Sequence, residues 1–282
     1  MSGKKRINLI MAMSLVIMLA MTYFSEHHEP EAPVKTLLDQ DTSQTGSVVI
    51  ERLSERISFR REGEQWLLTE PLQAPVNPYR IRQFLAIAHS RIDEGYPLAE
   101  DMSVFGFSAS SPKLYIDNDV LVFGSSHPLD GRRYVTHKNR LFLIALEDFS
   151  IFNSQATDFI EKKLLPADAV ISSIETPAWK LVRNSEGHWA TSPENWLNPE
   201  KQSRVLNAWK SARAIDIRQS AQTSMSDTQE IAVSLENGAI LHFSIIARKP
   251  SLLLERRDMG LQFEMTEETA KALLDPDDAG TS

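Results

Sequence analysis

The order of hydrophobic and polar residues predicts an apolar helix at the amino terminus, followed by short strands and a few amphipathic helices. The first apolar run, Ile7 to Phe24, has eighteen residues and no charged side chain. As a helix it would be about 27 Å long, close to the roughly 30 Å hydrocarbon core of a bilayer. Lys4, Lys5 and Arg6 precede it, and such a basic flank stays in the cytoplasm. The run therefore predicts a membrane anchor, with the rest of the chain periplasmic or otherwise extracytoplasmic.

A cleavable signal peptide is the alternative for this segment, since it shares the basic start and the apolar stretch. The run is longer than a usual signal core, and no small-x-small pair follows it closely. We therefore expect a cytoplasmic tail and transmembrane anchor over residues 1–24 and a flexible stalk over 25–46. Two α+β repeat units follow over 47–165 and 166–275, and a disordered tail over 276–282.

The two units are predicted because the chain resembles itself in order. Each begins with three apolar runs that suit strands, and a Gly-containing break before the third run is a hairpin signal. These runs are 48–50, 57–61 and 65–68 in the first unit, and 170–174, 179–183 and 188–190 in the second. Trp66 and Trp189 take equivalent places in the third run. The same strand pattern is thus written twice.

A helix follows the third run in both units. Asn77-Pro78 and Asn198-Pro199 have the same form, an N-cap residue followed by proline at the first helical position. Apolar residues then recur at helical spacing, which predicts one buried face for each helix. They are Ile81, Phe84, Leu85 and Ala88 in the first unit, and Val205, Leu206 and Trp209 in the second.

Further alternating segments close each unit with a meander and a short helix. The expected strands are 114–116, 120–123, 133–136 and 141–144 in the first unit, and 231–235, 239–243, 252–255 and 261–265 in the second. The short helical segments are expected around 146–152 and 266–274. The predicted class is therefore α+β, with an N-terminal transmembrane helix followed by two tandem repeats, each an antiparallel sheet with a packed helix.

The same residues carry a resemblance to a known family. One feature is the strand, turn and tryptophan of Phe59–Trp66, which ends near Pro71 and is followed by a helix. The others are Phe105-Gly106-Phe107 with Ser111-Pro112 opening a strand, the strand end Val122-Phe123-Gly124, and Arg133-Tyr134-Val135. On these, the chain resembles the bacterial domain-of-unknown-function family 4340 over about residues 48–215. Members are often encoded beside gliding-motility-type ABC transporter components. The resemblance implies a membrane-tethered accessory protein and carries over no functional residue.

Composition narrows the chemistry. The 282 residues include no cysteine, which excludes disulfides, thiolate metal sites and a cysteine nucleophile. The formal charge of −8 argues against nucleic acid as a partner. We find no nucleotide-binding glycine motif, and no cofactor is expected.

Several side chains could be considered for catalysis or metal binding, but each has a simpler interpretation. His27 and His28 with neighbouring glutamates belong to the expected stalk, where adjacent residues do not easily converge on one ion. The serines Ser108, Ser125 and Ser126, beside His127, do not fit a nucleophile elbow and suit loop chemistry. The acidic pairs Asp93-Glu94, Asp117/Asp119 and Glu267-Glu268 fall at turns and helix starts, where acids are locally favoured.

Tryptophan offers the one candidate contact. Trp66, Trp179, Trp189 and Trp209 occupy periodic positions that predict core packing, whereas Trp196 falls in a turn. Aromatic side chains on loops often anchor partner contacts, so Trp196 is the candidate partner residue. The alternative is that Trp196 packs beneath the start of its own helix.

Two functions fit these patterns. The first is a membrane-anchored accessory or assembly protein without catalysis of its own, which presents two units to an envelope protein partner such as an ABC-type transporter complex. The second is a cell-envelope carbohydrate-binding module or hydrolase that uses a groove between the units. A groove that gathered two or more carboxylates or histidines would favour the second.

Overall fold

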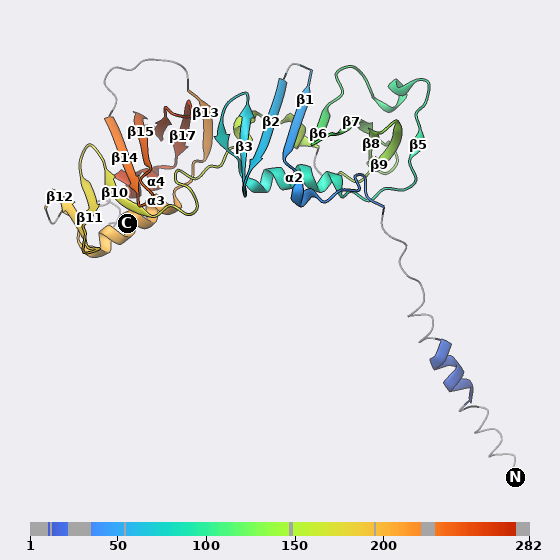
Figure 1. Ribbon diagram of the computed structural model, residues 1–282, viewed down its shortest axis with the longest axis horizontal. Helices are drawn as coiled ribbons and strands as arrows, with labels where there is room; N and C mark the ends of the chain where they lie inside the picture. The colour runs from blue at the N-terminus through green and yellow to red at the C-terminus, as the bar shows by residue number, and fades with distance from the viewer. Residues whose placement is uncertain are drawn as a thin grey trace, which may run out of the picture.

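The computed structural model describes residue 11 and residues 13–21, 35–53, 55–146, 149–194, 196–220 and 229–274. Over residues 35–274 the described parts form two antiparallel sheets with helices packed against them, so the predicted α+β class is confirmed (Figure 1). Residues 13–21, within the expected anchor, are helical, and their apolar side chains are exposed. Across the described residues no helix combines the length and the apolar character needed to cross a bilayer.

The first sheet has nine strands in the order β4-β3-β2-β1-β6-β7-β8-β9-β5. All neighbouring strands run antiparallel. Its elements are β1 (Ser47–Arg52), β2 (Glu55–Glu62), β3 (Gln65–Glu70), β4 (Ala74–Pro75), α2 (Pro78–Ala88), β5 (Tyr96–Pro97), β6 (Lys113–Ile116), β7 (Asp119–Ser126), β8 (Arg133–His137) and β9 (Arg140–Ile144). Four short 3-10 helices accompany it: η1 (Thr42–Gln44), η2 (Met102–Phe105), η3 (Ser150–Asn153) and η4 (Ala156–Phe159).

The second sheet has eight strands in the order β12-β11-β10-β14-β15-β16-β17-β13, again antiparallel throughout. Its elements are β10 (Ile171–Glu175), β11 (Lys180–Arg183), β12 (Trp189–Ser192), α3 (Pro199–Ser211), β13 (Asp216–Gln219), β14 (Gln229–Leu235), β15 (Ile240–Ala247), β16 (Leu252–Arg256), β17 (Leu261–Met265) and α4 (Glu267–Leu274). The two sheets are separate and lie end to end along the molecule (Figure 1).

The two sheets share one strand order. In each, the first strand lies between the second strand and the strand that opens the closing meander. In each, the helix follows the third strand or its extension, and the short strand after the helix pairs with the last strand of the meander. The difference lies at one edge. The third strand β3 of the first sheet is covered by β4, whereas its equivalent β12 is the edge strand of the second sheet.

Helix α2 begins as its sequence predicts and packs on one face of the first sheet. The Asn77 side chain accepts a hydrogen bond from the Tyr79 amide at 3.0 Å, and Pro78 stands at the first helical position. Phe84 is fully buried, and its ring centroid lies 5.7 Å from those of Phe152 and Phe159. The buried face of α2 therefore packs against η3 and η4, which follow the last strand of the meander.

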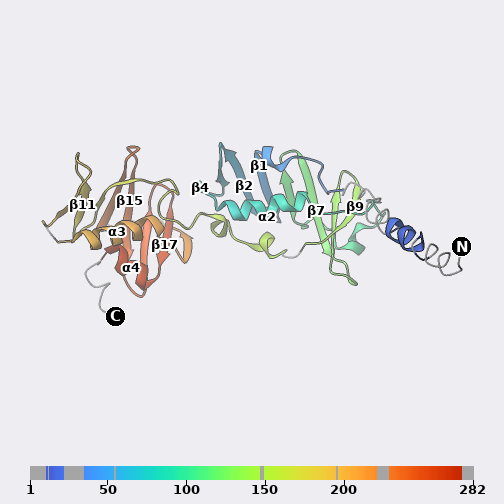
Figure 2. The same cartoon turned by 90° about the horizontal axis from the view of Figure 1, so that it is seen from below.

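Helices α3 and α4 cover the second sheet on the same side of the molecule as α2 (Figure 2). Trp209 of α3 has no exposed surface and lies 5.7 Å from the Phe243 ring of β15. Its indole nitrogen donates to the Leu273 carbonyl at 3.3 Å, and that of Trp179 donates to Leu274 at 2.8 Å. Two buried tryptophans thus hold the last turn of α4. The expected core role is met by Trp66, Trp179 and Trp209, whereas Trp189 is half-buried.

The expected stalk differs from the structure where the structure describes it. Residues 25–34 lie outside the described residues, but 35–46 pack against the first unit. Leu37 and Leu38 are buried, and their amides donate to the carbonyls of Ser90 and Ala88 at 3.0 and 2.9 Å. Two adjacent leucines show neither a helical nor a strand period, so the sequence did not predict that they cover the end of α2. This part of the expected flexible stalk is therefore packed against the first unit through Leu37 and Leu38.

Most predicted strands are confirmed, and the ones that were missed are short. Strands β4, β5 and β13 have two to four residues each and lie at or beside sheet edges. The expected helix around 146–152 is the shorter η3, and the helix expected at 266–274 is α4.

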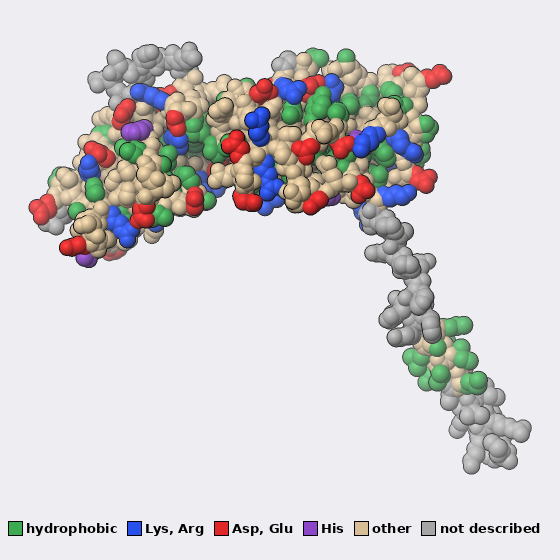
Figure 3. Space-filling view, in the orientation of Figure 1, with side chains coloured by type: hydrophobic (Ala, Val, Ile, Leu, Met, Phe, Trp, Pro, Cys, Tyr) green, Lys and Arg blue, Asp and Glu red, His purple; other side chains and the backbone are tan. Residues whose placement is uncertain are grey.

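Acidic and basic side chains are interspersed over the face seen in Figure 3.

Candidate functional site: the groove between the two sheets

The connecting segment, residues 159–164, begins at the last residue of η4 and continues as extended chain. It connects the two sheets through backbone hydrogen bonds on both sides. Toward the first sheet, the Asn77 amide donates to the Phe159 carbonyl at 2.8 Å, and the Glu161 amide donates to Pro75 at 2.9 Å. Toward the second, the Leu164 amide donates to Ala212 at 3.1 Å. The edge formed by β4 therefore faces the approach to β13, with this segment between them.

A groove of about 530 Å³ opens beside the connecting segment. We call it the inter-sheet groove. Its lining comes from β3, the start of α2, the connecting segment and the second sheet, and it is mainly apolar. The apolar lining residues are Trp66, Pro75, Val76, Pro78, Tyr79, Leu164, Leu165, Pro166, Ala167, Leu241, Met259 and Phe263. This volume lies within the range of about 300–1,000 Å³ that small-molecule sites occupy.

The charged lining of the groove is mostly cationic. Arg82, Lys163, Arg213 and Arg256 line it together with two carboxylates, Glu64 and Glu161. Arg213 lies 3.2 Å from Glu161, and Arg256 is bound by Asp258 at 2.5 Å. Arg256 holds the pKa of the Asp258 carboxyl below its usual range through these hydrogen bonds. No described carboxylate lies within ion-pair distance of Arg82 or Lys163.

The carboxylates of the groove are engaged with cations or amides. Glu161 also accepts a hydrogen bond from the Lys163 amide at 3.0 Å, and Glu64 lies 3.5 Å from Arg61. A pair of glycosidase acids would need two carboxylates aimed at one bond from opposite sides. Both groove carboxylates instead lie within ion-pair distance of an arginine, Glu64 of Arg61 and Glu161 of Arg213.

A second hollow of about 650 Å³ lies between η4 and β13 and contains three carboxylates. Each is already bound. Glu55 pairs with Arg52 at 2.6 Å, Asp158 accepts from the Gln155 amide at 2.7 Å, and Asp216 pairs with Arg218 at 3.0 Å. Among the described residues no group of three or more histidines and acids is arranged to hold a metal ion. In number, this hollow meets the condition of two or more carboxylates in a groove between the units. Each of the three carboxylates is held by a neighbouring arginine or amide.

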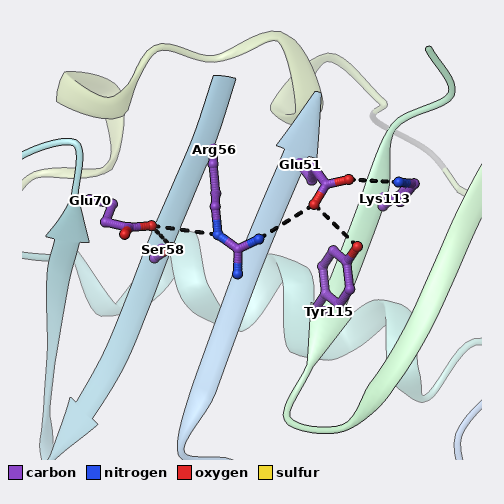
Figure 4. Close-up of polar contacts among 6 residues, drawn as sticks. All are labelled: Glu51, Arg56, Ser58, Glu70, Lys113 and Tyr115. Atoms are coloured by element: carbon purple, nitrogen blue, oxygen red, sulfur yellow. Dashed lines mark hydrogen bonds and ion pairs between the residues drawn. The ribbon is translucent and has the colours of Figure 1, made fainter. Parts of the chain in front are cut away.

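The face of the first sheet opposite α2 carries a row of polar contacts across four strands (Figure 4). Glu51 of β1 stands at its centre, 2.6 Å from the Lys113 ammonium and 3.4 Å from the Arg56 guanidinium. The Tyr115 hydroxyl donates to the same carboxylate at 3.2 Å. The hydrogen bond from Lys113 holds the pKa of Glu51 below its usual range. Arg56 continues the row to Glu70 of β3 at 3.5 Å.

Trp196, the predicted partner residue, is half-buried and packed against the second core. Its ring stacks on Trp179, with centroids 5.7 Å apart and planes 30° apart. The ring contact is with Trp179, which directly precedes β11, whereas the helix that follows Trp196 begins at Pro199. A partner contact through Trp196 stays a prediction.

The serines considered for catalysis and the neighbouring His127 are held in hydrogen bonds within the first unit. Ser125 donates to the Phe105 carbonyl at 3.0 Å, and Ser108 lies 2.8 Å from Ser110. His127 lies 2.9 Å from Asp130, three residues on. The contacts of Ser108 and His127 close turns, as loop chemistry predicts. Ser125 and Ser126 instead lie in strand β7, and the Ser125 contact reaches η2, twenty residues away. His27 and His28 lie outside the described residues.

The acidic residues considered for catalysis form hydrogen bonds or ion pairs with nearby residues at turns and at the surface. Asp117 accepts from the amides of Gly46 and Ser47 at 3.0 and 2.8 Å, and so ties the start of β1 to a turn. Asp119 and Asp93 pair with nearby cations, and Glu267 pairs with Lys271 one turn on.

Sequence reasoning missed the groove because its residues carry no motif. Trp66 was assigned to the core, which is correct, but its position in the groove depends on the second sheet. Lys163 and Arg213 are fifty residues apart in sequence and meet as an isolated antiparallel bridge. A cationic cluster in an acidic chain becomes visible only once the fold brings these residues together.

Comparisons with known proteins give one match. The model of a family described as "Domain of unknown function (DUF4340)" matches residues 66–230. The matched range begins in β3 and ends in β14, somewhat later at both ends than the range expected from the sequence. It therefore includes the connecting segment and most of the groove. No curated protein and no solved structure matches the chain.

Proposed function

The chain belongs to the DUF4340 family of domains of unknown function, and from that premise we propose that it is a membrane-anchored accessory or assembly protein. In this proposal it has no catalytic activity of its own and presents two repeat units to an envelope or transporter partner. The anchor is residues 7–24, and the bulk of the chain is extracytoplasmic. The exposed apolar side chains of residues 13–21 support an anchor, because they need a covering that water does not give.

The repeat interpretation rests on the shared strand order. Eight strands of the first sheet have an equivalent in the second, with a helix at the same point of the sequence. We interpret the two units as copies of one ancestral unit. A copied unit keeps its core and differs at its edges, and β4 is such a difference.

The observation that carries the proposal is the edge of β12. Its equivalent β3 pairs on both sides, with β2 and with β4. Strand β12 pairs with β11 alone among the described residues. An open edge presents unpaired amides and carbonyls to which an extended segment of another protein can add as a strand. We propose that the partner docks there by strand addition.

Site-specific photocrosslinking in native membranes tests this docking. A photoreactive residue at Ala190, which is exposed on β12, is compared with one at Ala239, which is exposed at the tip of the β14–β15 hairpin. We expect one envelope protein to crosslink reproducibly at position 190 and not at 239. Equal capture at both positions, or none at 190, would contradict the proposal.

The anchor is tested separately by topology. With a tag at the carboxyl terminus, external protease should remove the tag from spheroplasts while the chain stays in the membrane fraction. A protected tag, or a chain recovered in the soluble fraction, would contradict the proposed location.

The inter-sheet groove favours a second candidate function, that of a binding module of the cell envelope. The specific observation is a groove of about 530 Å³ whose walls come from both units and their connection. An oligosaccharide ligand would use Tyr79, which is 60% exposed, as a stacking platform. A saturable change in tryptophan fluorescence on adding envelope oligosaccharides to the full chain would support this candidate, and a flat titration would count against it.

A further inference from the structure

We propose that the inter-sheet groove binds an anionic amphiphile, a molecule with an apolar body and one carboxylate or phosphate group. This inference rests on the second candidate function, the groove as a binding site, and names the class of ligand. It does not depend on the docking of a partner at β12.

The apolar body is indicated by the side chains that the groove leaves open. Tyr79 is 60% exposed, and Met259 and Leu241 are half-buried in the same lining. Behind them lie nearly buried side chains such as Leu164 and Phe263. An apolar surface in a concave site is stabilised by covering it with another apolar surface. The ligand must therefore contribute more than a charged group.

The anionic group is indicated by the excess of cations. Four cations and two carboxylates line the groove, although the whole chain has a formal charge of −8. Arg213 is paired with Glu161, but Arg82 and Lys163 meet no described carboxylate within ion-pair distance. Arg82 lies over the Tyr79 ring at 5.8 Å, which keeps its charge beside the exposed apolar surface. A guanidinium and an ammonium at one site suit a carboxylate or phosphate.

The backbone of the groove disfavours a peptide as the ligand. A peptide strand would need free amides and carbonyls along one edge. Pro75, Pro78 and Pro166 have no amide hydrogen, and the Pro75 carbonyl already accepts from Glu161. The Asn77 amide is bound to Phe159. Recognition must come from side chains, which suits a compact amphiphile.

Photoaffinity labelling of the full chain in phosphatidylcholine vesicles tests the proposal. The probe is dodecanoate with a diazirine in its alkyl chain, and the labelled residues are mapped by peptide mass spectrometry. We expect saturable labelling within residues 64–82, 161–167 and 256–263, which contribute lining residues. Unlabelled dodecanoate and dodecyl phosphate should compete. Dodecanol, dodecylammonium, acetate and inorganic phosphate should not.

Two matched double variants locate the anionic contact. Arg82→Gln with Lys163→Gln should raise the half-saturating probe concentration about tenfold or more. Arg60→Gln with Lys210→Gln removes one arginine and one lysine that are exposed and outside the groove, and should leave it unchanged. Circular dichroism of both variants controls for folding.

The outcomes separate the ligand class from the site. Equal competition by dodecanol, or unchanged labelling in the groove double variant, would overturn the anionic amphiphile. Competition by maltohexaose or by an acidic peptide alone would keep a binding groove and replace the class of ligand. Labelling confined to residues outside the groove would overturn both the ligand and the site.

Discussion

The Glu161 carboxylate lies 3.2 Å from the Arg213 guanidinium and joins the connecting segment to the chain that enters the second sheet. On the other side of the segment, the Glu161 amide donates to the carbonyl of Pro75 in β4, an edge strand of the first sheet. One residue therefore contacts both units. The two contacts differ: the ion pair joins two partly exposed side chains, whereas the hydrogen bond joins the backbone of the connecting segment to the backbone of β4.

Replacing Phe159 should destabilise the chain far more than replacing Glu161. Phe159 has no exposed surface, and its ring lies 5.2 Å from Phe59. Phe159→Ala leaves a cavity that costs about 3–5 kcal/mol. Glu161→Gln breaks a partly exposed ion pair worth less than about 1 kcal/mol. Urea denaturation of both variants measures the two values, and similar losses would contradict the packing described.

Gly124→Ala is expected to disturb the first sheet strongly. A Cβ at Gly124 would lie 2.4 Å from the Phe105 carbonyl oxygen, which is backbone and cannot move aside easily. Gly131 serves as control, since its added Cβ meets no atom within 4 Å and only its φ of 72° opposes alanine. We expect a loss of about 1–2 kcal/mol for Gly131→Ala and a larger one for Gly124→Ala. Equal thermal stability of the two variants would show that the contact at Gly124 is absent.

Trp179→Phe removes the donor to the Leu274 carbonyl while keeping an aromatic ring. The lost hydrogen bond is buried, so we expect a destabilisation of about 1–3 kcal/mol and faster proteolysis within α4. Trp189→Phe is the control, because Trp189 is half-buried at the edge strand β12. Chemical denaturation compares the two. A larger loss for Trp189→Phe would contradict the assignment of Trp179 as one of the two tryptophans that hold α4.

The row of contacts at Glu51 predicts a pH dependence. Because Lys113 lowers the pKa of Glu51 in the folded chain, the ionised carboxylate stabilises the fold above the ordinary glutamate pKa of about 4.3. That contribution is lost as the pH falls through the lowered pKa. Glu51→Gln should therefore be less stable than the natural chain at neutral pH, and the difference should shrink in acid.

The same group can be observed directly by NMR titration of the Glu51 carboxyl. Lys113→Met should move its pKa upward, toward the ordinary value, whereas Lys180→Met on the second sheet should not. An unchanged titration in Lys113→Met would show that the lowered pKa has another cause.

Local patterns explain how much of the fold the sequence could predict. The Asn77-Pro78 and Asn198-Pro199 starts of α2 and α3 are predictable because cap and proline preferences act within one turn. Strands of four or more alternating residues were predicted for the same reason. Strand β13 was missed because Ile217 is its one buried residue, and a single apolar position has no period.

The candidate site was less predictable because its residues meet through tertiary pairing. Leu37 and Leu38 cover α2 from a segment whose composition suggests solvation. Lys163 and Arg213 form their bridge only where the connecting segment passes the second sheet. The tryptophan stack of Trp179 on Trp196 also joins residues of different elements, so a turn position alone predicted more exposure than Trp196 has.

Hydrogen exchange of the backbone amides of Trp189–Ser192 tests the central claim, that the open edge of the second sheet receives a partner strand. The full chain is measured once purified and once in native membranes. Leu67 and Leu68 of β3 are the internal reference, because they pair with β2 on one side and with β4 on the other. The account predicts fast exchange of the outward amides of β12 in the purified chain and slow exchange in the membrane, while Leu67 and Leu68 stay protected in both. Slow exchange at β12 in the purified chain, or equally fast exchange in both samples, would contradict it.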